Sequence, residues 1–161
     1  MINKFPVSSV SQDPYTDGSV QPSDQTYYDY SQGSPAWKLD ISPLTPNSKR
    51  TWGVFAGFSK VRVKHGDVNT PSLQQTTDFT YFRGMDGDIS SPSGDRREVT
   101  LTASDGTAVS DAPAFAGRVF EAITRNGFGG PIVTNDITVP WSSATTAVQS
   151  DVIKVGSGAP L

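Results

Sequence analysis

The chain has 161 residues, of which 35% are hydrophobic, and it carries 13 basic against 16 acidic side chains, for a formal net charge of -3. This length fits one ordinary domain, and scattered charge with an acidic balance argues against a nucleic-acid partner, which needs a concentrated basic surface. The absence of cysteine excludes disulfides, cysteine nucleophiles and thiolate metal sites.

Composition favours an all-β fold. Helix-forming residues are scarce, and Glu98 and Glu121 are the only glutamates. Thr, Val and the aromatic residues suit pleated strands, whereas Asp, Gly, Pro and Ser suit turns. We therefore predict an antiparallel strand-turn meander or sandwich-like sheet. It would consist of an irregular lead-in (1–25), a single all-β domain (26–155) and a disordered tail (156–161).

In chain order, the lead-in holds three prolines, and we expect one strand in it around Val7 to Val10. It lacks the apolar segment of a signal peptide, and no apolar run in the chain approaches the ~20 residues of a membrane span. Residues 26–30 and 37–40 are predicted to be strands that pair as a hairpin. A loop marked by Pro43 and Pro46 follows.

The clearest alternation lies in "SKVRVKH" (59–65), where valines alternate with basic residues. Val61 and Val63 point to one side of the predicted strand and the basic side chains to the other, which is typical of a half-buried strand. The segment 74–83, "QQTTDFTYFR", alternates Thr77, Phe79 and Tyr81 in the same way. We expect these two segments to pair antiparallel.

Further strands are expected in the second half of the chain. Residues 98–110 predict a hairpin with an Asp-Gly turn. Residues 114–122 could form two helical turns, but the β-branched residues that follow favour a strand from Arg118. The last two strands are predicted in "IVTNDITVPW" (132–141) and "AVQSDVIKV" (147–155).

The stretch "TYFRGMDGDISSPSGD" (80–95) is the strongest candidate for chemistry. Asp86, Asp88 and Asp95 offer hard oxygen ligands for calcium, although the EF-hand pattern with its closing glutamate is absent. Asp86 and Asp88 could also form a carboxylate pair for glycoside hydrolysis. Asp and Gly are equally typical of turns. We interpret the stretch as a long turn with no metal, cofactor or catalytic residue.

His65 and the aromatic residues are the other candidates. His65 is the only histidine, and no "GxSxG" elbow accompanies it, so an exposed polar role is favoured over catalysis. The tryptophans and tyrosines could stack on sugars, but in a chain poor in Leu and Ile they are better explained as core. The predicted packing anchors are Trp37, Trp52, Phe58, Phe79, Tyr81, Phe120 and Trp141.

Four blocks occur in a specific order: "KRTWGVFAGFSKVRVKHGD" (49–67), "TYFRGMDGD" (80–88), "AFAGRVFEAITRNGFGG" (114–130) and "VPWSSATTA" (139–147). This succession resembles a segment of the large actinobacterial RHS (YD-repeat) proteins. The resemblance runs from about Val7 to Ala147. The chain departs from the family in lacking the cleavage core and toxin domain, and in having only degenerate repeat signatures, such as "YYDYSQGS" (27–34). No catalytic residue of the family can therefore be transferred.

The resemblance implies a structural role. RHS proteins are exported or wall-associated, their repeats build a β-strand shell, and many enclose a C-terminal toxin that carries the enzyme activity. We expect a non-enzymatic segment of such a secreted shell, which pairs with neighbouring repeats or self-associates through its strand edges. The alternatives are a carbohydrate-binding or adhesion module on cell-wall glycan, which exposed coplanar rings would favour, and a hydrolase using Asp86, Asp88 or His65.

Overall fold

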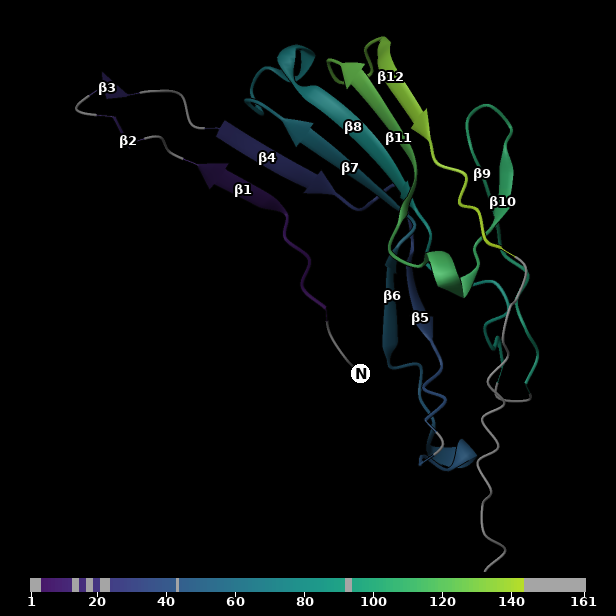
Figure 1. Ribbon diagram of the computed structural model, residues 1–161. Coiled ribbons are helices and arrows are strands. Elements are labelled where there is room, and N and C mark those ends of the chain that lie inside the picture. Colours follow the sequence, from purple (N-terminus) through teal and green to yellow (C-terminus); the bar gives the residue numbers. More distant parts are fainter. Residues whose placement is uncertain are drawn as a thin grey trace, which may run out of the picture.

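The computed structural model describes residues 4–12, 15–16, 19–20, 24–42, 44–91 and 94–143. The predicted all-β class is confirmed, because these residues form twelve strands and three one-turn 3-10 helices. Six strands make one antiparallel sheet in the order β1-β4-β7-β8-β11-β12, and the other six make three two-stranded sheets (Figure 1).

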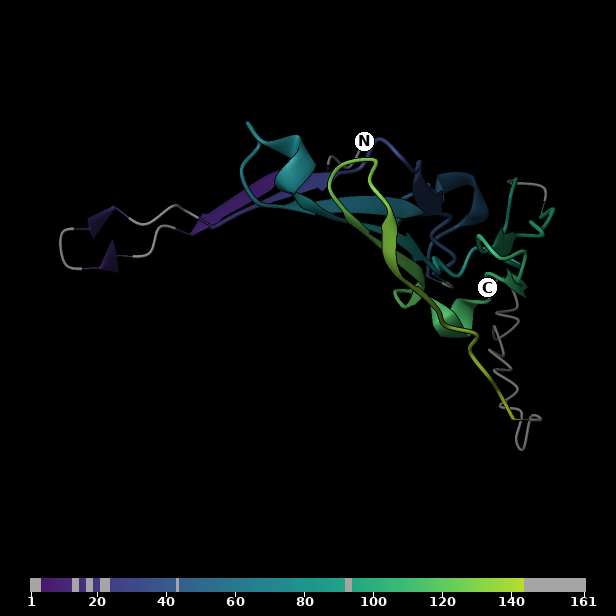
Figure 2. The same ribbon diagram turned by 90° about the horizontal axis from the view of Figure 1, so that it is seen from above.

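The main sheet contains β1 (Ser9–Gln12), β4 (Asp24–Asp29), β7 (Lys60–His65), β8 (Gln75–Tyr81), β11 (Val119–Asn126) and β12 (Ile132–Ile137). The two-stranded sheets pair β2 (Tyr15–Thr16) with β3 (Ser19–Val20), β5 (Pro35–Lys38) with β6 (Val54–Phe58), and β9 (Thr100–Thr102) with β10 (Ala108–Ser110). The 3-10 helices are η1 (Asn47–Lys49), η2 (Pro71–Leu73) and η3 (Pro113–Phe115). Seen from above, the main sheet is a single twisted layer (Figure 2).

One face of the main sheet is polar, as the alternation in β7 predicts. Arg62 lies opposite Asp78 in the register of β7 and β8, and its Nη2 donates to the carboxylate at 3.0 Å. The ring of Phe128 lies over this face, with its centroid 5.4 Å from the Arg62 guanidinium and 5.0 Å from the Lys64 ammonium. These cations are therefore held by partners within the chain.

The opposite face of the main sheet is apolar. The register places Tyr28 of β4 beside Val63, Val61 beside Phe79 of β8, and Phe79 beside Ala122 of β11. All five side chains are half-buried, and none is fully buried. A sheet with one apolar face ordinarily buries that face against a second layer. In the part of the chain that the structure describes, this face stays partly open.

The fully packed core is small and lies where the β9–β10 hairpin and η3 meet the ends of β8 and β11. Phe82, Ala103 and Phe120 are buried there, and the ring of Phe82 lies 5.2 Å from that of Phe120 and 5.6 Å from that of Phe115. Exposed large apolar side chains outnumber fully buried ones among the described residues. They include Phe5, Ile41, Leu44, Leu73, Phe128, Ile132, Val133 and Trp141.

Several sequence predictions are confirmed by the strand register. The segment 59–65 and its return arm 74–83 pair antiparallel as β7 and β8. The hairpin in 98–110 forms as β9 and β10. The ambiguous segment 114–122 contains only the single turn η3 before β11, so the strand prediction holds.

The predicted hairpin between residues 26–30 and 37–40 is wrong. β4 lies between β1 and β7 in the main sheet, whereas β5 pairs with β6 in a separate sheet. The strand expected around Val7 to Val10 is present as β1, at Ser9–Gln12, but it belongs to the main sheet and not to an irregular lead-in (1–25). The predicted strand 147–155 and tail 156–161 lie outside the described residues.

Candidate functional site

Residues 83–85, in the first half of the stretch predicted to be a long turn, are held by a buried carboxylate that comes from elsewhere in the chain. Asp111, which is 0% exposed, accepts hydrogen bonds from the backbone N–H groups of Arg83 at 2.7 Å, Gly84 at 2.8 Å and Met85 at 3.2 Å. A buried charge requires several such partners to offset its desolvation. We call this arrangement the Asp111 clamp.

Gly84 sits at the tightest point of the clamp. Its φ is +66°, in the region that side chains other than glycine rarely adopt, and it is buried. A Cβ atom added there would lie 2.9 Å from the Cα of Pro113 and 3.0 Å from the Cβ of Ala116. The glycine therefore lets the η3 segment approach the loop closely enough for Asp111 to reach the three N–H groups.

Of the aspartates that suggested calcium, Asp86 and Asp95 accept hydrogen bonds within the protein, and Asp88 forms a long ion pair while its Oδ2 accepts no hydrogen bond. Asp86 accepts from the N–H of Val99 at 2.9 Å and the hydroxyl of Ser110 at 2.6 Å, and these bonds, that from Ser110 first, lower its pKa. Asp88 lies 3.7 Å from the Arg97 guanidinium, and Asp95 accepts from the Ser91 hydroxyl at 2.7 Å. No group of three metal-ligating side chains occurs among the described residues.

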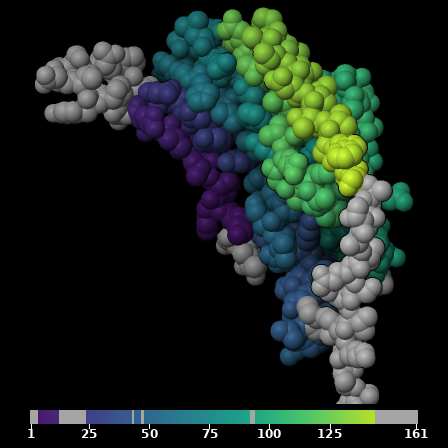
Figure 3. Space-filling model, in the orientation of Figure 1, coloured from purple at the N-terminus to yellow at the C-terminus, as the bar shows by residue number. Residues whose placement is uncertain are grey.

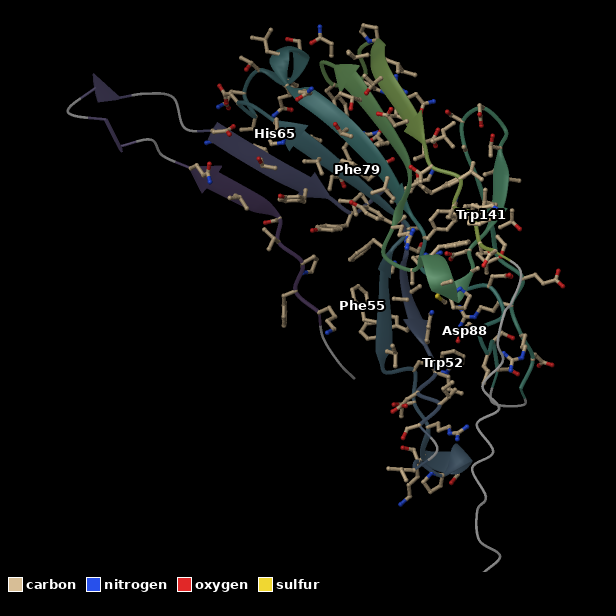
Figure 4. All side chains as sticks on the ribbon, in the orientation of Figure 1. Trp52, Phe55, His65, Phe79, Asp88 and Trp141 are labelled. Carbon is tan, nitrogen blue, oxygen red and sulfur yellow. The ribbon has the colours of Figure 1, made fainter. Side chains whose placement is uncertain are left out.

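His65 lies at the end of β7, at the opposite end of the sheet from Asp88 (Figure 4). The ring is exposed, and its Nδ1 lies 3.0 Å from the Thr26 hydroxyl. A hydrolytic site would need this imidazole beside a nucleophile and an orienting carboxylate. The structure does not bring His65 together with Asp86 or Asp88, so the residues of the hydrolase alternative do not form one site.

A second buried acid was not singled out from the sequence. Glu121 on β11 is 6% exposed and accepts hydrogen bonds from the backbone N–H of Ser104 at 3.0 Å and from its hydroxyl. Asn135 on β12 donates to the same hydroxyl at 2.8 Å. These bonds tie the turn of the β9–β10 hairpin to the edge of the main sheet.

An open groove of about 1170 Å³ lies along the β5–β6 hairpin. We call it the aromatic groove. Trp37 and Phe55 form a cross-strand pair with ring centroids 4.9 Å apart and planes tilted by 54°, and Phe55 meets Phe58 at 5.8 Å and 78°. Trp52, which is 37% exposed, also lines the groove (Figure 4).

Three cations line the aromatic groove: Lys4, Arg83 and Arg97. The Arg97 guanidinium stacks over the Trp52 ring at 5.3 Å, and Lys4 lies 6.0 Å from the Phe55 centroid. The Nε atoms of Arg83 and Arg97 are buried and donate to no acceptor. None of the described lining residues is an aspartate or glutamate. The groove is therefore lined by apolar rings together with three cations and no described carboxylate.

The sequence indicated part of this groove. Trp37, Trp52 and Phe58 were expected to be packing anchors, and the structure places all three along the groove. Trp37 reaches the other rings through the pairing of β5 with β6, and neither this pairing nor the contribution of Arg83 and Arg97 has a local signal in the sequence. Trp141 does not act as an anchor, because it is 85% exposed.

Comparisons with protein-family models, with curated proteins and with solved structures found no match to this chain. Within the described ranges, no helix has the length and apolar character needed to cross a membrane.

Proposed function

We propose that the chain is a non-enzymatic structural module, a β-sheet segment of a larger secreted or cell-wall-associated β-structure of the RHS (YD-repeat) type. The proposal is supported most directly by the main sheet. Its six strands form one layer whose apolar face is only half-buried, and a face of this kind ordinarily packs against further strands. The order of the sequence blocks that resemble the RHS family points the same way.

The edges of the main sheet support the same proposal. β1 and β12 lie at the two ends of the strand order, and they border opposite sides of the molecule (Figure 3). Every described side chain of β1 is exposed, and on β12 Ile132 and Val133 are 51% and 62% exposed. Exposed edge strands are a template for pairing with another chain or with more of the same chain, and the apolar side chains of β12 favour such pairing further. On this proposal the neighbouring strands cover both edges, and the effector that the shell carries performs the chemistry.

The carbohydrate-binding alternative depends on rings that offer a flat stacking surface. The ring pairs of the aromatic groove are tilted by 54° and 78°, so they form a contoured surface. We therefore favour the structural role.

The proposal is tested by the association state of the isolated chain. We expect size-exclusion chromatography with light scattering to detect concentration-dependent self-association, and we expect Ile132→Lys to increase the monomer fraction because a lysine opposes edge pairing. Val68→Lys is the matched control, since Val68 is 52% exposed but lies in a loop outside the strands. A monomer whose sharp thermal unfolding is independent of concentration would contradict the proposal.

A further inference from the structure

The aromatic groove has a property that a structural role does not require: two arginines that line it have hydrogen-bond donors without acceptors. The Nε donors of Arg83 and Arg97 are buried without an acceptor. The nearest carboxylate oxygen to Arg97, Oδ2 of Asp88, lies 3.7 Å away, which is too far for a hydrogen bond. A buried donor left without an acceptor costs about 1–3 kcal/mol. The side chains of Arg83 and Arg97 also line the groove, so a ligand with anionic acceptors would meet positive charge there that no lining carboxylate balances.

The aromatic rings that line the groove favour an apolar partner. The ring of Phe55 is tilted steeply against those of Trp37 and Phe58. The rings therefore form an uneven surface with spaces between them, and not a flat platform. Branched or aromatic side chains fit such spaces. The hairpin that carries the rings has only two strands, and a two-stranded hairpin is marginally stable unless something packs on it.

Size and backbone chemistry favour a polypeptide over a small molecule. The groove, at about 1170 Å³, exceeds the roughly 300–1,000 Å³ of typical small-molecule pockets. β5 and β6 pair only with each other in the described structure, so each keeps one edge free for main-chain hydrogen bonds. An added peptide strand uses such an edge, whereas a glycan or a lipid has no backbone that matches it.

We propose that the aromatic groove binds an extended polypeptide segment in which acidic side chains stand next to aromatic or branched apolar ones. The apolar side chains lie on Trp37, Phe55 and Phe58, and the carboxylates accept from Arg83 and Arg97, with Lys4 adding positive charge. Buried charge-assisted hydrogen bonds of this kind are the strong ones in recognition. The inference goes beyond the structural role, because the groove carries it whether or not the main sheet belongs to a shell.

The test is a selection from a phage-displayed random dodecapeptide library on the immobilised full chain. We expect the recovered peptides to combine Asp or Glu with neighbouring Phe, Trp, Leu or Val. Synthetic copies should change the tryptophan fluorescence, because Trp37 and Trp52 line the groove. Recovery of no consensus, or of neutral or basic peptides, would overturn the inference, as would a neutral glycan that produces the same fluorescence change.

Charge-removing variants locate the binding. We expect the affinity for the peptide to fall roughly tenfold in Arg83→Gln and in Arg97→Gln, which is equivalent to about 1.4 kcal/mol. Lys4→Gln, at an exposed position that folding does not need, should weaken it a few-fold. Arg118→Gln is the matched control, since Arg118 is exposed and does not line the groove, and it should leave the affinity unchanged. Equal affinity of the groove variants and the control for the peptide would refute the site. This outcome does not depend on the oligomeric state, which tests the structural role.

Discussion

Removing the carboxylate of the Asp111 clamp should destabilise the protein more than removing any exposed aspartate. In Asp111→Ala the N–H groups of Arg83, Gly84 and Met85 all lose their acceptor. At about 1–3 kcal/mol for each unsatisfied buried group, the loss is at least ~3 kcal/mol. That is a large part of the 5–15 kcal/mol by which a typical domain is stable.

The matched control is Asp105→Ala. Asp105 also accepts a backbone N–H, from Thr107 at 2.8 Å, but it lies in the exposed turn of the β9–β10 hairpin, where water replaces the lost acceptor. We expect this variant to cost less than ~1 kcal/mol. Asp111→Asn keeps one acceptor oxygen and the side-chain volume, so its loss of stability should lie between those of Asp105→Ala and Asp111→Ala. It should remain folded even if Asp111→Ala does not.

The assay is urea unfolding followed by tryptophan fluorescence and far-UV circular dichroism, with extrapolation to water. For a chain of this size, ~3 kcal/mol corresponds to a decrease in Tm of about 6–12 °C. A loss for Asp111→Ala within ~1 kcal/mol of that for Asp105→Ala, at an unchanged m-value, would refute the argument that this carboxylate organises the loop.

Three further predictions concern the same loop. Gly84→Ala should cost about 2–5 kcal/mol, from the strained φ and the collision of its Cβ, whereas Gly87→Ala, whose Cβ meets open space, should cost only about 1–2 kcal/mol in urea unfolding. Because its hydrogen bonds hold the pKa of Asp86 below the ordinary value, Asp86 stabilises the fold above about pH 4, and this contribution is lost as the pH falls through the lowered pKa. The fall in stability on acidification should therefore be shallower in Asp86→Asn, measured by urea unfolding at a series of pH values; identical slopes would contradict this. Calcium and EDTA should both leave Tm unchanged, since Asp86, Asp88 and Asp95 are engaged by protein partners, and a rise in Tm with calcium that Asp86→Ala abolishes would contradict it.

The strands that could be predicted are those in which apolar and polar side chains alternate within the strand's own sequence. In β7 and β8 the side-chain period of two fixes which residues share a face, and the observed register, which places Val61 beside Phe79, agrees with it. The pairing of β4 could not be predicted in the same way. A turn does follow β4, but the choice of Val63 as the neighbour of Tyr28 depends on packing between distant segments.

The buried acids lay beyond sequence reasoning for a related reason. Asp111 acts on residues 26 to 28 positions earlier, and Glu121 acts on Ser104, 17 positions earlier. An aspartate beside a strand end has the same local pattern whether it is exposed or buried. The "DGD" stretch shows the converse, because its composition suits a metal loop and a turn equally, and only the observed partners of Asp86 identify it as part of a turn.

The junction between β6 and β7 has a mechanical consequence. A single residue, Ser59, separates β6 of the hairpin from β7, one of the two middle strands of the main sheet. The carbonyl of Ser59 accepts the N–H of Tyr81 at 2.9 Å. A load applied to the hairpin therefore passes along covalent backbone into β7. β7 is hydrogen-bonded to β4 on one side and to β8 on the other. A load along β7 therefore acts on these hydrogen bonds in shear, where many of them must break together. Tension on a partner bound in the aromatic groove would therefore be transmitted through β6 into the middle of the main sheet.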